Sequence, residues 1–262
     1  MAPLLTYMVE YPMNPWNRPE AVAQTQTRAV DQGLRSYMLK VYNYMASATL
    51  LTGIVAWFVA GAAVGVDAET GQMGLTPFGQ SIFVGPLHWV VIFAPLVMVM
   101  VIGAGLSRMR TGTLQACFWS FAVLMGLSMS SLFLAYTGQS IARVFFITAA
   151  MFGGMSILGY STQRDLTGMG HFLIMGVWGL VVASIVNMFM HSTGLNFAVS
   201  ILGVVIFTGL IAYDTQKLKA IYYQVAGNAD STARASIMGA LNLYLDFINL
   251  FVSLLRIMGD RR

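Results

Sequence analysis

The stretch from residue 196 to residue 218 reads NFAVSILGVVIFTGLIAYDTQKL, an apolar run that carries a single acidic residue, Asp214. A transmembrane helix needs about 20 mostly apolar residues, so this run is long enough to cross a bilayer. Six more windows of this kind occur, and the seven predicted spans are 41–66, 85–106, 114–136, 140–161, 171–191, 196–218 and 236–258. The runs are long and do not alternate, so strands are not expected. The predicted fold class is all-α, a polytopic membrane protein with seven transmembrane helices.

The composition of the chain agrees with a membrane protein. Its 262 residues are 57% hydrophobic and 9% charged, whereas about 25% of a soluble domain is charged. Too little polar surface is left to cover a globule in water, so the natural solvent is the lipid bilayer. The net charge of +4 comes from cations at segment ends, which indicates topology and argues against nucleic-acid binding. We expect a polar cytoplasmic N-terminal arm at 1–40 and a seven-helix membrane domain at 41–262.

The orientation is predicted from lysine and arginine, which are enriched on the cytoplasmic side of membrane proteins. Ten of these residues fall on one side of the predicted spans: Arg18, Arg28, Arg35, Lys40, Arg108, Arg110, Arg164, Lys217, Lys219 and Arg234. The N-terminus is therefore predicted to be cytoplasmic. Seven full spans then place the C-terminus outside, together with Arg256, Arg261 and Arg262, against the same tendency. Two interpretations stay open: a last segment that spans fully, which its length favours, and a re-entrant one.

Two acidic residues, Asp214 and Asp246, lie well inside apolar runs. A carboxylate in hydrocarbon costs about 2.5–3.5 kcal/mol on insertion scales, and such residues usually face the bundle interior or a water-filled cavity. Asp214 lies roughly 12 Å from one end of its span and Asp246 roughly 15 Å from the start of its own, at the rise of a helix. The two helices are antiparallel neighbours, so the carboxyls can face each other and share a proton, or bind Ca²⁺ when ionised. The alternative is a pair that only holds helices together.

The last predicted span also carries a polar stripe. Asn242, Asp246, Asn249 and Ser253 recur at spacings of four, three and four residues, which places them on one side of a helix. Such a stripe can line a pathway for ions. It can equally mark a helix at the centre of the bundle that is bonded to small polar neighbours.

Arg108 and Arg110 follow the second predicted span. Either they extend toward lipid headgroups, or one of them reaches inward and bonds an ionised aspartate as a latch. No H-E-x-x-H, P-loop or G-x-S-x-G pattern occurs, and no nucleophile–base set is apparent. We therefore expect that the protein is not an enzyme and has no cofactor, with Ca²⁺ as a bound or transported ion.

Two motifs in the last third of the chain resemble the paired signatures of the Bax inhibitor-1 family, also called the transmembrane Bax-inhibitor-motif family. Residues 212–216 read AYDTQ and residues 240–251 read ALNLYLDFINLF. The resemblance implies a seven-helix fold with the last helix central. It implies a pH-sensitive Ca²⁺ leak in which two aspartates, matching Asp214 and Asp246, form a hydrogen-bonded pair. It also implies an arginine latch at the end of the second span, matching Arg108 or Arg110.

The first functional hypothesis is a pH-sensitive Ca²⁺ leak channel gated by protonation of the aspartate pair. The alternative is a membrane interaction protein, because the resemblance also implies members that modulate a membrane-bound ATP-dependent protease and members that act in stress or cell-death pathways. The polar N-terminal arm is the expected contact for such a partner. Proton-coupled transport has less support, since no inverted repeat is visible. The few lysines and glutamates and the compact loops favour a bacterial inner membrane.

Overall fold

The computed structural model describes residues 19–66, 72–106 and 108–262, and for 19–30 only the backbone is considered. The elements are α1 (Pro19–Ala63), β1 (Val64–Val66), β2 (Met73–Leu75), α2 (Pro77–Phe83), α3 (Leu87–Gly105), α4 (Thr111–Ala135), α5 (Gly138–Ser161), α6 (Thr167–Met190), α7 (Thr193–Val225) and α8 (Ala229–Met258). Within the described residues, seven helices are long and apolar enough to cross a membrane, namely all of them except the short α2. The predicted seven-helix fold is confirmed, and the chain is a multi-pass membrane protein.

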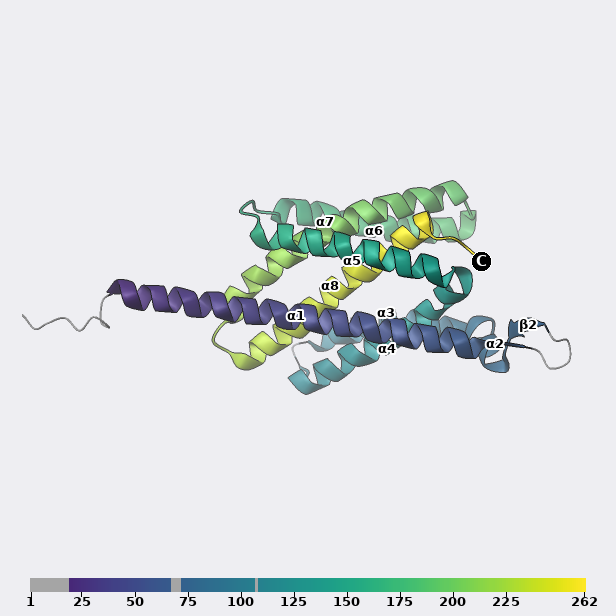
Figure 1. The fold of residues 1–262 in the computed structure, drawn as a ribbon, viewed down its shortest axis with the longest axis horizontal. Helices are drawn as coiled ribbons and strands as arrows, with labels where there is room; N and C mark the ends of the chain where they lie inside the picture. Colours follow the sequence, from purple (N-terminus) through teal and green to yellow (C-terminus); the bar gives the residue numbers. More distant parts are fainter. Residues whose placement is uncertain (1–18, 67–71, 107) are drawn as a thin grey trace, which may run out of the picture.

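Helix α8 runs through the centre of the bundle, as the sequence resemblance implied. In Figure 1 it passes between α1, α3 and α4 on one side and α5, α6 and α7 on the other. In its most apolar window 67% of the residues are buried, against 6% for α6. Helix α6 therefore presents most of its side chains to lipid, and α8 supplies the core. Large exposed apolar side chains on α6 include Phe172, Met175, Trp178 and Phe189.

Helix α1 begins at Pro19 and not near Val41, so the predicted boundary between arm and membrane domain falls inside a continuous helix. Leu34, Tyr37 and Met38 are buried in the core. Arg35, Ser36 and Lys40 interrupt this stretch, so its apolar residues do not form a long apolar run. The part of the predicted arm at residues 1–18 lies outside the described residues.

The connection between the first two spans contains a small β-hairpin, which corrects the expectation that strands are lacking. Strands β1 and β2 pair antiparallel, with Gly65 opposite Gly74. Each strand has three residues. Such short segments give no alternating pattern that hydropathy could reveal.

Two glycines allow helices to touch backbone to backbone. A Cβ at Gly159 of α5 would overlap the carbonyl oxygen of Ala212 in α7. A Cβ at Gly126 of α4 would lie 2.8 Å from the Thr52 carbonyl oxygen of α1. Small residues permit this close approach of helices in lipid. By contrast, Gly153 has open space around its α-carbon.

The two ends of α8 are each bonded to an end of α4. Near the start of α8, Thr111 Oγ1 donates to Asp230 Oδ1 at 2.5 Å, and Arg234 donates to the carbonyl oxygen of Leu106. Past its end, the amide of Arg262 donates to the Ala135 carbonyl at 3.1 Å. Helix α8 is unbroken between these ends, which agrees with a full span and not with a re-entrant segment.

The chain end is held by further contacts with the turn between α4 and α5. The Thr137 amide donates to the Asp260 carbonyl at 3.0 Å. Arg143 forms an ion pair with the Asp260 carboxylate at 2.9 Å. These contacts keep residues 259–262 close to the end of the bundle at which α7 begins (Figure 1).

Candidate functional site

Helices α7 and α8 lie side by side and antiparallel, and two close contacts fix their register. A Cβ at Gly203 of α7 would lie 2.5 Å from Ser253 Oγ of α8. Nearer the other end, Leu218 of α7 fills the space over Gly239 of α8. Asp214 and Asp246 fall between these contacts, one on each helix, and this register brings them to within about one helical turn of the same depth.

The carboxyl groups of Asp214 and Asp246 lie within hydrogen-bonding reach of each other. Asp246 is 6% exposed, and Asp214 is half-buried. The Oδ2 atom of Asp246 is buried and has no hydrogen-bond partner among the residues that the structure describes. Since two ionised carboxylates offer only acceptors, a hydrogen bond between them requires that one carries a proton. The arrangement can therefore hold a shared proton or, when both groups are ionised, a cation.

Lys217 lies one turn from Asp214 on α7. Its Nζ lies 5.8 Å from the centroid of the Tyr213 ring. It lies closer to the C-terminal end of α7 than Asp214 does.

The polar stripe of α8 is partly satisfied by its own backbone. Asn249 Nδ2 donates to the Leu245 carbonyl at 2.9 Å, and Ser253 Oγ donates to the Asn249 carbonyl at 2.7 Å. Asn249 is exposed, and Asn242 and Ser253 are half-buried. The stripe therefore extends from the carboxyl pair toward the end of the helix, with part of its polar surface accessible.

Sequence reasoning missed two threonines of α7. The Oγ1 atoms of Thr208 and Thr215 are buried with no hydrogen-bond partner in the described part of the chain. They are seven residues apart and so share a face of α7. A buried hydroxyl without a partner is costly, so these two oxygens are available to a ligand or to water. Their seven-residue spacing within the run 196–218 could have indicated them from the sequence. Isolated threonines are common in apolar spans, however, so the spacing alone does not single them out.

The structure does not bring Arg108 or Arg110 to the aspartates. Both side chains are exposed at the turn between α3 and α4. Neither makes a hydrogen bond or ion pair with Asp214 among the described residues. At this turn Arg234 of α8 takes an inward position instead, where it donates to the carbonyl of Leu106. The latch therefore stays a prediction.

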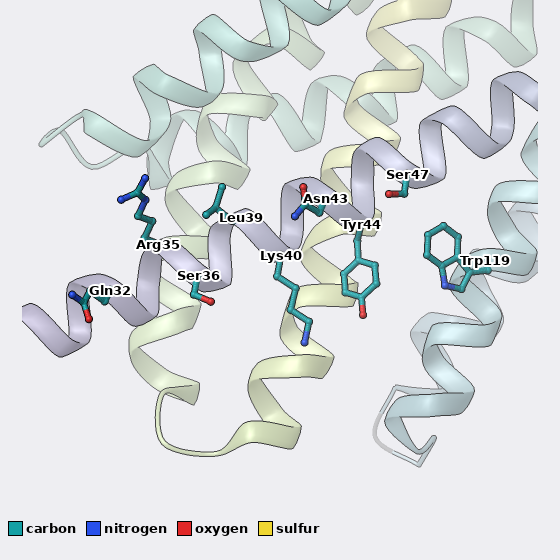
Figure 2. Close-up of a pocket in the computed structure, with 9 residues that line it drawn as sticks. All are labelled: Gln32, Arg35, Ser36, Leu39, Lys40, Asn43, Tyr44, Ser47 and Trp119. Carbon is teal, nitrogen blue, oxygen red and sulfur yellow. The ribbon is translucent and has the colours of Figure 1, made fainter.

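A groove of about 600 Å³ lies along α1 and α4, separate from the carboxyl pair. Figure 2 shows Lys40 and Tyr44 on the side of α1 that faces Trp119 of α4, with Arg35 extending in another direction. Lys40 Nζ lies 6.0 Å from the Tyr44 ring centroid, and the Tyr44 and Trp119 rings are 6.2 Å apart. Cations and amphipathic rings together are typical of a membrane–water interface. The groove shares no residue with the carboxyl pair.

The described residues contain no cluster of three or more histidine, cysteine, aspartate or glutamate side chains suited to a metal ion. Ca²⁺ usually takes six to eight oxygen ligands. Asp214 and Asp246 supply a minority of these, so water and neutral oxygens would have to supply the rest. Two carboxylates suit a transient cation better than a permanently held one.

Comparisons with known proteins agree with this architecture. The family model described as "Inhibitor of apoptosis-promoting Bax1" matches residues 34–262. A protein of Rickettsia prowazekii (strain Madrid E), RP147, is 49% identical over 238 residues, which are 91% of this chain and 95% of that protein. The inner membrane protein YbhL of Escherichia coli (strain K12) is 43% identical over 245 residues, or 93% of this chain and 98% of YbhL. A protein of Caulobacter vibrioides is 46% identical over 253 residues, 95% of this chain and all of that protein.

Proposed function

Because this chain belongs to the Bax inhibitor-1 family, we propose that it is a pH-sensitive Ca²⁺ leak channel gated by protonation of Asp214 and Asp246. One observation carries the proposal: two carboxyl groups from different transmembrane helices lie within hydrogen-bonding reach at the centre of the bundle. Charges at this depth are expensive in lipid and usually mark an ion or proton pathway. Among the described residues, no arginine or lysine forms an ion pair with either carboxyl group.

Protons and Ca²⁺ compete for the pair in this mechanism. A shared proton joins Asp214 and Asp246 and leaves a single negative charge, which attracts a divalent cation weakly. Loss of that proton places two negative charges together, and they repel each other unless a cation lies between them. Protonation therefore changes both the distance that the two carboxyls prefer and the affinity of the site for Ca²⁺.

The polar stripe and the two threonines extend the path along the helices. Asn249 and Ser253 continue on α8 beyond Asp246, and Thr208 offers an unpartnered hydroxyl on α7. Neutral oxygens bind Ca²⁺ more weakly than carboxylates do, and conduction requires sites that an ion can leave. We propose that these side chains are the pathway-lining groups.

The test is Ca²⁺ flux into liposomes that carry the purified protein, measured at several pH values. We expect flux that changes with pH in the wild type. Asp214→Asn and Asp246→Asn each fix one position in a neutral form, so these variants should lose most of the pH dependence. The matched control is Asp165→Asn, which changes an exposed aspartate of the α5–α6 turn outside the spans and should leave the pH profile unchanged. Wild-type flux that is flat across pH, or Asn variants with the wild-type profile, would contradict the proposal.

We further propose that the protein lies in a bacterial inner membrane with its N-terminus in the cytoplasm, because its relative YbhL is an inner membrane protein and the cations gather on one side of the spans. Association with a membrane protease or a stress pathway remains the alternative hypothesis. Residues 1–18, a part of the expected contact, are outside the described chain. If the protein co-purifies with a protease and still does so when residues 1–18 are deleted, the contact with the protease lies outside residues 1–18.

A further inference from the structure

A cavity of about 260 Å³ lies where the ends of α6 and α8 meet the start of α7 and the α4–α5 turn. Its polar lining comes from Tyr136, Ser184, Asn187, Asn196, Arg256 and Arg261. We infer that this cavity is a binding site for an anion that bears a phosphate or carboxylate group. The cavity is at the opposite end of α8 from Arg234, and it shares no residue with the aspartate site.

The charge of the cavity is the first argument. Two guanidinium side chains, Arg256 and Arg261, line it, and no lining residue is acidic. The nearby carboxylate of Asp260 is already paired with Arg143 at 2.9 Å. Both arginines are exposed, so water and salt screen part of their mutual repulsion, and an anion between them would remove the rest. Guanidinium groups also match the geometry of phosphate and carboxylate oxygens.

Ordinary structural roles account for only part of this charge. Arg256 lies in the last turn of α8, where a cation is stabilised by the helix dipole, equivalent to roughly half a negative charge. Arg261 lies over the Tyr136 ring, with its guanidinium carbon 5.9 Å from the ring centroid. These contacts hold the two side chains in place. The helix dipole offsets only about half of one charge, so more than one of the two positive charges has no counter-charge.

Neutral donors complete the site. Asn187 Oδ1 accepts a hydrogen bond from the Ser192 amide at 3.0 Å, so its Nδ2 group is left as a donor beside the cavity. Asn196 belongs to the first turns of α7, whose N-terminal end carries a partial positive charge. An anion here would meet guanidinium, amide and helix-terminus donors together, a combination that is typical of phosphate sites.

The position of the cavity suggests an effect on transport, and this step rests on the proposed function. Arg256 lies about one turn beyond Ser253, the last residue of the polar stripe. Two positive charges at that end of the pathway would repel Ca²⁺, and a bound anion would neutralise them. Occupancy of the cavity would thus raise cation access at this end of the bundle.

Binding is tested with inorganic phosphate and the full chain in detergent, with chloride used to keep ionic strength constant. The readout is the thermal unfolding midpoint as a function of phosphate concentration. We expect a saturable rise in the wild type. In Arg256→Gln/Arg261→Gln the rise should be lost, or the apparent Kd should increase at least about tenfold, since two charge-assisted contacts are removed. The matched control is Arg110→Gln/Arg164→Gln, which removes two exposed arginines at other turns and should respond as the wild type does.

A lysine pair keeps the test informative if the glutamine pair does not fold. Arg256→Lys/Arg261→Lys retains both charges and should retain the phosphate response with a weaker apparent Kd. An equal midpoint shift in the wild type, the glutamine pair and the control pair would show an adventitious ion effect only and would overturn the inference. The inference would also be overturned if the wild type showed no saturable shift of its unfolding midpoint with phosphate and no specific retention of phosphatidylglycerol in the lipid measurement described next.

A second measurement separates a lipid headgroup from a free anion. Native mass spectrometry of protein released from phosphatidylglycerol vesicles should show a retained phosphatidylglycerol that the glutamine pair loses, if the anion is a headgroup. Phosphate binding without lipid retention would identify a soluble anion.

For the transport step, the glutamine pair should raise Ca²⁺ flux several-fold while keeping its pH dependence. Binding without that change would refute only the transport step, and a protein without any flux would refute the proposed function while leaving the anion site standing.

Discussion

Tyr244 and Thr52 form a buried hydrogen-bond chain whose two members should differ sharply in cost when removed. Tyr244 of α8 is fully buried. Its hydroxyl lies 2.8 Å from Thr52 Oγ1 of α1, and Thr52 Oγ1 donates to the Ala122 carbonyl of α4 at 2.9 Å. Because the single hydroxyl hydrogen of Thr52 goes to that carbonyl, Tyr244 must be the donor in the other bond. The chain therefore joins α8, α1 and α4 in one direction.

Replacing Tyr244→Phe removes a donor and leaves Thr52 bonded to Ala122. The expected loss is one net hydrogen bond, about 0.5–1.5 kcal/mol and near the lower end in a membrane protein. Replacing Thr52→Val keeps the shape but leaves the Tyr244 hydroxyl buried without an acceptor, which costs about 1–3 kcal/mol. In the double variant the orphaned hydroxyl is gone, so its cost should fall short of the sum of the two single costs by roughly 1 kcal/mol.

The assay is equilibrium unfolding in mixed micelles with increasing dodecyl sulfate, followed by far-ultraviolet circular dichroism for the wild type, the two single variants and the double variant. The free energies of unfolding give the coupling between the two positions directly. The matched control is Thr148→Val, because Thr148 Oγ1 is buried and donates only to the Val144 carbonyl of its own helix at 2.8 Å. A Tyr244→Phe cost that equals or exceeds that of Thr52→Val, or strictly additive costs, would refute the assigned direction of the chain.

Two further predictions concern packing and a loop carboxylate. Gly159→Ala places a methyl group against the Ala212 carbonyl and should destabilise the α5–α7 contact by about 1–3 kcal/mol, whereas Gly153→Ala meets open space and should be neutral or slightly stabilising; similar unfolding free energies for the two variants would contradict this. In the α5–α6 turn, hydrogen bonds from the Thr167 side chain and amide hold the pKa of Asp165 below its ordinary value. That contribution to stability is present above the unfolded-state pKa and is lost as pH falls through the folded-state pKa. Thr167→Ala should therefore raise the Asp165 pKa in a carbon-13 NMR titration, and an unchanged value would count against the side-chain bond.

Hydropathy was sufficient to predict the seven helices, because each span is a long apolar run that averaging detects. The start of α1 escaped this method, since the buried residues Leu34, Tyr37 and Met38 lie in a stretch whose average hydropathy is lowered by polar residues. The aspartate pair could be expected from the sequence, because adjacent spans are antiparallel and depth can be counted along each helix.

Contacts between distant segments were beyond the sequence. The cation that reaches inward at the α3–α4 turn is Arg234, which is 128 positions along the chain from its acceptor Leu106. Arg256 and Arg261 appeared in the sequence only as an exception to the charge rule for topology. Their shared cavity emerges once the end of α8 lies beside the start of α7. Proximity of this kind depends on which helices are neighbours, and hydropathy does not encode that.

The anchoring of α8 to α4 restricts how the centre of this protein can move. Sliding α8 along its axis would break the Thr111–Asp230 bond at one end or the Ala135–Arg262 bond at the other. Helix α7 is held as well, because Gln216 accepts a hydrogen bond from the Leu166 amide and donates one to the Arg164 carbonyl in the α5–α6 turn. If the distance between the two carboxyls changes while α8 stays in place, either their side-chain torsions change or α7 tilts and breaks the Gln216 bonds.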